Sequence, residues 1–387
     1  MNIKANIYGL LWALNATALI SCSNEIPIIG NDETVDEGGV ELKVSAEINN
    51  DLSTRVSYDP SGNPKWNWNV GDEIGIICTG YKVGGTFTSL PVGDQMSEYV
   101  NVPFKFSYNE DNRISEFVPG NSGAVFLKDA GKTYIFNGYY PFTGNKGDSS
   151  GIITLDTSTD QDYEKRYKYL TILYADGGSA DATTKTLNFQ GDAAFKHKMA
   201  KIRFLVYFDD MADRQSSGKH IFNHPDLGTG ITPVYSETAQ EYLNNCRLLV
   251  SGVRHKGEFK FATGEIKPIS SVTPLVDWDL TDSSVGAELI EAPYTDASHT
   301  GVAGIEINAH LIPQVFDMRL TLIDKYGKTY TTKGNTSRQL NLESGKEYVV
   351  TMTFDLNELS ISDVLIADWT EDATVRDPFK TGTGKEE

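Results

Sequence analysis

Residues 201–208 read KIRFLVYF, a stretch in which apolar side chains return at every second position. Side chains of a β-strand point alternately to its two faces, so this spacing is typical of a strand with one face in a core. We therefore expect a half-buried strand here. The side chains expected to face inward are Ile202, Phe204, Val206 and Phe208.

Similar alternating stretches recur on both sides of this one. The clearest is residues 40–48, where Leu42, Val44, Ala46 and Ile48 share one face. Others occupy residues 133–142, the hairpin pattern of 318–331, and residues 348–354. Helical spacing is scarce, and its best candidate, residues 238–249, is short. Many short strands separated by turn residues predict an all-β chain built from sandwiches.

The strand pattern is interrupted by Asp176-Gly177-Gly178-Ser179-Ala180-Asp181, before a new series of strands begins near Phe195. At 387 residues the chain has room for two domains. We expect two β-sandwich domains of similar size, over residues 40–190 and 191–380.

Composition excludes several classes of function. The formal net charge is −19, which repels phosphate backbones, so we expect no nucleic-acid partner. Past residue 21, no stretch approaches the ~20 apolar residues of a membrane span.

The first 21 residues have the features of a bacterial secretory signal, with Lys4 ahead of an apolar run from Ile7 to Ile20. The run ends in Leu19-Ile20-Ser21-Cys22, which matches a lipobox, and predicts a lipid anchor on Cys22. The alternative is an ordinary signal peptide that happens to contain Cys22. The residue after the cysteine is Ser23, not the Asp that retains many Gram-negative lipoproteins in the inner membrane, and this favours the outer membrane. The polar, acidic residues 22–39 are expected to form a flexible tether.

The other two cysteines, Cys78 and Cys246, fall in different predicted domains, and we expect two buried thiols.

His220 and His224 have a ligand-like spacing, but Pro225 follows them and a loop is the simpler interpretation. The acidic loop 156–164 lacks the pattern of a calcium loop. No hydrolase or metalloprotease motif occurs, so we expect neither enzyme, metal nor cofactor.

Tryptophans are the remaining lead for ligand binding. Exposed indoles can stack on sugars, which would make them a glycan platform, but sandwich cores also contain Trp. We favour core positions. The candidates are Trp66, Trp68, Trp278 and Trp369.

Six short motifs occur in a fixed order along the chain. They are Thr54-Arg55-Val56, a W…GD-x-IG pattern at residues 66–75, Tyr139-Tyr140-Pro141-Phe142, an F-x-H-x-[LM]-A-K-[IV] pattern at 195–202, Gly345-Lys346-Glu347-Tyr348, and Ile366-Ala367-Asp368-Trp369. Their order resembles the fimbrillin-like lipoproteins of Bacteroidetes, the type V pilin family. The chain is similar to that family over nearly its whole length after residue 22.

The resemblance implies two transthyretin-like β-sandwich domains in a lipoprotein subunit of a surface fimbria. It also implies that an arginine-specific protease cuts near the N-terminus, here after Arg55, and removes a first strand. A neighbouring subunit would then fill the groove with its own C-terminal strand. The candidate donor residues are Ile361, Val364 and Ile366, and the alternative is that they form only the last strand of the second sandwich.

Two functions follow as hypotheses. The first is a structural or accessory fimbrial subunit that takes part in adhesion, with other fimbrial subunits, the outer membrane, and surface glycans or proteins as partners. The second is a surface glycan-binding lipoprotein of a polysaccharide-uptake system, which would need the tryptophans to be exposed. A glycosidase is a distant third, because it would need two carboxylates converging in a cleft.

Overall fold

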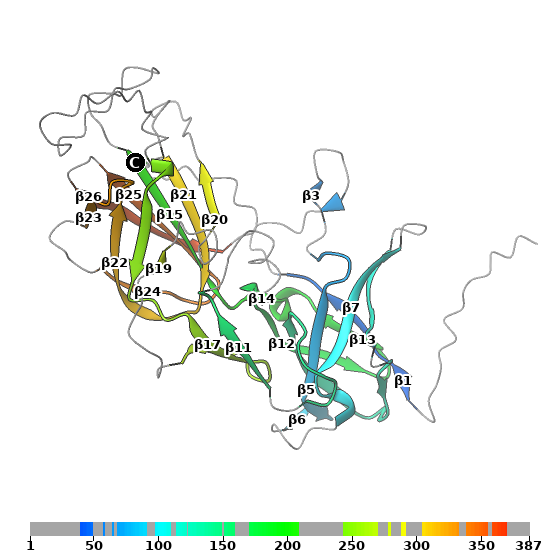
Figure 1. The fold of residues 1–387 in the computed structure, drawn as a ribbon. Helices are drawn as coiled ribbons and strands as arrows, with labels where there is room; N and C mark the ends of the chain where they lie inside the picture. Colours follow the sequence, from blue (N-terminus) through cyan, green and yellow to red (C-terminus); the bar gives the residue numbers. More distant parts are fainter. Residues whose placement is uncertain are drawn as a thin grey trace, which may run out of the picture.

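The computed structural model describes residues 39–48, 57–58, 64–65, 68–90, 97–109, 114–121, 123–148, 151–158, 170–208, 243–269, 278–279, 288–291, 304–332, 338–354 and 358–369. Its named elements are β-strands and two short 3-10 turns, η1 (Ser97–Tyr99) and η3 (Gly191–Ala193). The expected all-β class is confirmed. Figure 1 shows two β-rich halves side by side, with β11 and β17 between them.

The first half is a barrel. One sheet of nine strands contains a run of seven whose ends, β10 and β5, pair with each other and so close the run on itself. In order around the barrel these are β10 (Thr133–Tyr140), β12 (Leu173–Asp181), β13 (Thr186–Phe189), β2 (Lys43–Ala46), β8 (Ile114–Pro119), β7 (Val102–Asn109) and β5 (Glu73–Val83). Attached to them are β6 (Thr86–Ser89) on β5 and β14 (Lys196–His197) on β12.

The second half consists of two five-stranded sheets around one core, as a sandwich does. The first runs β20 (Glu288–Glu291), β21 (Gly304–Leu311), β15 (Ala200–Phe208), β25 (Lys346–Phe354), β26 (Leu359–Asp368). The second runs β19 (Trp278–Asp279), β16 (Arg247–Ser251), β22 (Val315–Ile323), β23 (Thr329–Thr331), with β24 (Arg338–Asn341) paired to β22. Side chains of both sheets share one hydrophobic cluster, which includes Phe204, Ile307, Val350, Leu248 and Leu320.

A small sheet joins segments that lie far apart in the sequence. It consists of β11 (Ile152–Asp156), β17 (Lys256–Lys260) and β18 (Glu265–Pro268). Two further pairs are β1 (Val40–Glu41) with β9 (Phe126–Leu127), and β3 (Ser57–Tyr58) with β4 (Pro64–Lys65). The domain limits at 190 and 191 stay predictions.

The strand predicted from KIRFLVYF is β15, and Ile202, Phe204 and Val206 lie in the core as expected. The side chain of Phe208 lies outside the described residues. The expectation of a half-buried strand was incomplete, because Arg203, Leu205 and Tyr207 on the other face are buried too. The helical spacing over 238–249 was misleading at its end, since Arg247, Leu248 and Leu249 begin strand β16.

Candidate functional site

Residues 39–48 fill a position in the barrel wall that we call the strand slot, between β13 and β8. The strand β2 runs parallel to β13, with Val44 opposite Leu187 and Ala46 opposite Phe189. On its other side it pairs with β8 at a single position, Val44 opposite Phe117. The barrel is therefore closed at this point by a strand from the N-terminal end of the described chain.

Apolar side chains fasten this segment to the barrel core. Leu42, Val44 and Ile48 are each at most 5% exposed and belong to the same cluster as Phe104, Phe136 and Phe189. The outward side chains make polar contacts with the turn around η3. Gln190 Nε2 donates to Ser45 Oγ at 2.9 Å, and the Gly191 amide donates to Glu47 Oε1 at 2.7 Å.

The indole of Trp68 closes one end of the strand slot. Its Nε1 donates to the carbonyl oxygen of Ala46 at 3.1 Å, and the residue is 4% exposed. Edge-to-face contacts surround the ring, with centroids 5.3 Å from Phe117, 5.6 Å from Tyr140 and 5.2 Å from Phe195. Aromatic pairs favour this geometry, so the ring is held from three sides.

The turn after Trp68 explains the spacing of the W…GD-x-IG pattern. Gly71 has a φ of +99°, which residues with a side chain rarely adopt. Asp72 Oδ2 accepts a hydrogen bond from the Asn69 amide at 2.8 Å. Asp72 Oδ1 accepts the Tyr140 hydroxyl at 3.2 Å, and burial raises the pKa of the Asp72 carboxyl. Gly75 lies opposite Tyr139, where an added Cβ would come within 2.2 Å of the ring.

Motifs that lie far apart in the sequence meet between the barrel and the sandwich. Trp369 is stacked on His197, and His310 meets the same indole edge-on with centroids 4.4 Å apart. Backbone hydrogen bonds link the same segments, since Gly345 N donates to Met199 O and Trp369 N donates to Gly345 O. Burial, together with the charge of Lys201, lowers the pKa of His197 to about 3, so its imidazole is neutral.

A cluster of apolar side chains surrounds this junction. Tyr139 from β10 is stacked on Phe261, with ring centroids 4.7 Å apart, and Asn137 Nδ2 donates to Ala262 O at 3.1 Å. The cluster also contains Ile77, Met199 and Trp369. Together these contacts connect the barrel to the sandwich through a packed interface.

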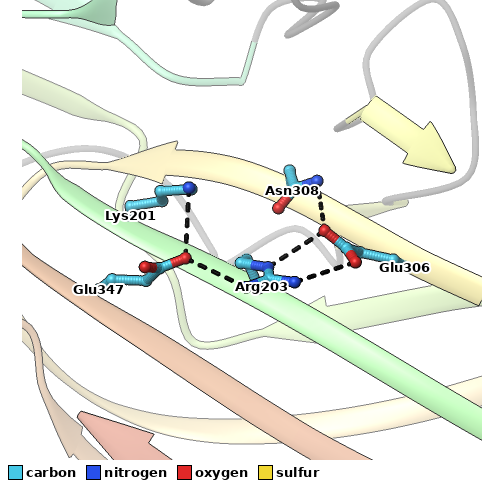
Figure 2. A network of polar contacts seen from close by, with 5 residues as sticks. All are labelled: Lys201, Arg203, Glu306, Asn308 and Glu347. Atoms are coloured by element: carbon cyan, nitrogen blue, oxygen red, sulfur yellow. Dashed lines mark hydrogen bonds and ion pairs between the residues drawn. The ribbon is translucent and has the colours of Figure 1, made fainter. Parts of the chain in front are cut away.

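The sequence reasoning did not predict a buried ion network on the face of β15 that points away from the sandwich core (Figure 2). Arg203 donates to Glu306 through two nitrogens, at 3.1 and 3.0 Å, and its Nη1 lies 3.5 Å from Glu347 Oε1. Lys201 Nζ lies 3.2 Å from the same oxygen, and Asn308 Nδ2 donates to Glu306 Oε1 at 2.9 Å. Two cations balance two carboxylates, as burial requires.

The candidate donor residues lie on β26, the last strand of its sheet. Ile361 and Val364 pack against the sandwich core, whereas Ile366 is 57% exposed. β26 pairs with β25 along its length. On the other edge of β26, the pairings of the described residues include one bridge, between Thr332 and Leu359.

Two of the four tryptophans of the possible glycan platform have described side chains. These two, Trp68 and Trp369, are buried, so neither indole offers a stacking face to a sugar. The side chains of Trp66 and Trp278 lie outside the described residues, as do Cys22 and Arg55. Cys78 and Cys246 are both buried thiols, as expected.

Within the described ranges, no group of three or more His, Cys, Asp or Glu side chains is placed to hold a metal ion. Nor does any helix in that part of the chain have the length and apolar composition to cross a membrane.

A sequence profile described as fimbrillin-like matches residues 54–369. No protein with a curated description matches the chain. Among solved structures, a Bacteroides ovatus protein assigned to cell adhesion is 20% identical with a TM-score of 0.52, over 86% of this chain and 98% of its own. This likeness shows a shared fold.

Two further structures match with lower scores. A Bacteroides uniformis protein, also assigned to cell adhesion, is 15% identical with a TM-score of 0.47, over 86% of this chain and 98% of its own. A fimbrial protein from Bacteroides vulgatus is 11% identical with a TM-score of 0.41, over 85% and 99%.

Proposed function

Because the chain belongs to the fimbrillin-like family, we propose that it is a structural or accessory subunit of a surface fimbria that takes part in cell adhesion. Its role is mechanical rather than catalytic, and its partners are other fimbrial subunits. Assembly proceeds by strand addition, in which a strand of one subunit completes a sheet of the next.

The observation that carries this proposal is the strand slot. Residues 39–48 precede Arg55, so a cut after Arg55 would leave β1 and β2 joined to the barrel only by non-covalent contacts. Their departure would expose the edges of β13 and β8 and the space filled by Leu42, Val44 and Ile48. An open sheet edge beside an apolar groove is a template for another strand.

The donor in this proposal is β26 of a second subunit. It is a ten-residue edge strand with apolar side chains at Ile361, Val364 and Ile366. The exposure of Ile366 supports this assignment, because the side chain contributes little to the core of its own subunit.

We also propose the route to the cell surface. Residues 1–21 direct export, Cys22 receives the lipid that holds the protein in the outer membrane, and residues 22–39 form the tether. The two folded parts are transthyretin-like sandwiches over 40–190 and 191–380, the first of them closed into a barrel. The shared core between the two sheets of the second half supports this description.

The alternative, a glycan-binding lipoprotein, has no observation in its favour here. Of its four tryptophans, the two with described side chains are buried.

The test is to isolate the protein from surface fractions of its native host. Mass spectrometry would determine the mature N-terminus, and a gel run without boiling would detect polymers. A start at Val56 with a ladder of high-mass bands is expected for a shaft subunit. An acylated Cys22 on a monomer would contradict polymerisation through Arg55 cleavage, and would leave an anchoring or accessory role.

A further inference from the structure

The carbonyl of Ala46 is bonded by a side chain at the point where the neighbouring strand stops pairing. On the β8 side, β2 pairs at Val44 with Phe117. Backbone groups of every second residue point to the same side of a strand, so the carbonyls of Val44 and Ala46 face the same way. Two residues along, the partner of Ala46 is Trp68 Nε1 at 3.1 Å. The indole thus supplies the next hydrogen bond of the ladder.

The three aromatic rings in contact with Trp68 come from outside residues 39–48. The rings that surround it belong to Phe117, Tyr140 and Phe195, all of which follow Arg55 in the chain. Phe117 lies on β8 and Tyr140 on β10, both strands of the barrel. The indole N–H would therefore keep its aim into the strand slot after the resident strand had left.

Beside the side-chain contacts of Ser45 and Glu47, the slot has hydrogen bonds between backbone atoms. Lys43 N donates to Lys185 O, Glu47 N to Phe189 O, and Phe195 N to Glu47 O, at 2.9 to 3.0 Å. Such contacts accept any extended segment, whereas the buried Leu42, Val44 and Ile48 require apolar side chains at set positions. The Trp68 donor at the end of the ladder adds a polar constraint on the register to these apolar ones.

We propose that Trp68 is the positioning residue for any strand in the slot, including one from a second copy of this chain, and that its indole N–H fixes how far that strand enters. The second half of this inference rests on the proposed function, that is, on replacement of the resident strand. The occupant has an extended backbone, apolar side chains on the face that meets the barrel core, and a carbonyl placed where Ala46 O now lies.

The test uses the full chain with a recognition sequence for a site-specific protease inserted after Arg55, cut under native conditions. A fluorescein-labelled peptide of residues 39–48 is added, and its uptake and release are followed by anisotropy. From Trp68→Phe, which keeps an aromatic ring and loses the N–H, the peptide should leave about three- to tenfold faster than from the unchanged chain.

A matched control is Tyr348→Phe. It also removes a donor to a backbone carbonyl, that of Asn341 at 2.6 Å, but in the sandwich. Its release rate should equal that of the unchanged chain. Equal rates for Trp68→Phe and the unchanged chain would overturn the role of Trp68 while leaving strand replacement intact. No uptake by the unchanged chain would overturn strand replacement itself.

A second measurement decides the matter if Trp68→Phe does not fold, as judged by circular dichroism. A peptide with a thioamide at residue 46 carries a weaker acceptor at the atom that Trp68 contacts. It should leave the unchanged chain faster than the normal peptide. Equal release of the two peptides would contradict the proposal.

Discussion

The indole of Trp369 lies flat on the imidazole of His197, with ring centroids 4.0 Å apart and planes inclined by 13°. His197 ends β14, which pairs with β12 of the barrel, and Trp369 follows β26 of the sandwich. A stack between these rings therefore couples the last described residue to the barrel, and its strength depends on the charge of the imidazole.

Acid should weaken the fold through His197. Its pKa is about 3 in the folded protein, against about 6.5 in an unfolded chain, so the unfolded state binds the proton more readily. Stability that is present above pH 6.5 is lost as the pH falls from 6.5 towards 3. The slope approaches about 1.4 kcal/mol per pH unit for one proton. Measured by urea unfolding between pH 6.5 and 5, His197→Phe should show a shallower slope than the unchanged chain. Equal slopes would contradict the prediction.

Arg203 should be far more important to stability than an exposed cation. Arg203→Met leaves Glu306 and Glu347 buried without their guanidinium, and removing one partner of a buried ion pair costs about 3–5 kcal/mol. Chemical denaturation would measure the loss. The control is Lys260→Met, whose ion pair with Glu265 at 2.7 Å is exposed, and whose unfolding midpoint should not move.

A second substitution tests the cause. Adding Glu306→Gln to Arg203→Met removes one of the two buried carboxylate charges that have lost the guanidinium, so the double variant should be more stable than Arg203→Met alone. If it is less stable, the loss in the single variant comes from packing instead of charge.

Gly75 should not accept a side chain. A Cβ there would lie 2.2 Å from the ring of Tyr139, which is itself stacked on Phe261, so the ring cannot move without opening the interface. We expect Gly75→Ala to cost about 1–3 kcal/mol, as overpacking does. Gly131→Ala, where the nearest atom is 3.4 Å away on an Asp129 side chain, is the control and should be close to neutral. Thermal unfolding of the two variants side by side distinguishes them.

Features that depend on neighbouring residues could be predicted from the sequence, whereas features that depend on contacts between distant residues could not. Alternation places Ile202 and Phe204 in a core, because a strand with one buried face needs only local information. It gives no information about whether the second face is covered, so the burial of Arg203 and Leu205 was not predicted. The pairing of Arg203 with Glu306 spans 103 residues, and depends on which strands become neighbours.

The motifs behave in the same way. A core position for Trp68 could be predicted from composition, but its bond to Ala46 required knowledge that the barrel closes at β2. A signal was present in residues 304–311, where Glu306, Asn308 and His310 alternate with apolar residues. The other residues of this strand are apolar or glycine, so the alternating polar side chains could have indicated that its second face is also buried and is polar. Helical spacing at 238–249 did not predict the strand that begins at Arg247, because that strand depends on the pairing of β16 with β22.

Ile366 offers a way to separate assembly from folding, on the premise of the proposed function. The side chain is 57% exposed on β26, so Ile366→Asp should leave the unfolding midpoint of the monomer unchanged. If β26 enters the strand slot of a second subunit, the new carboxylate would lose its hydration in an apolar groove, which is strongly unfavourable. The ladder of polymers on a gel run without boiling should then disappear. Val315→Asp is the control, because Val315 is 52% exposed on the other sheet of the sandwich and has no place in strand addition. Loss of the ladder in both variants would indicate a general effect of surface charge, and retention in both would exclude Ile366 from the donor face.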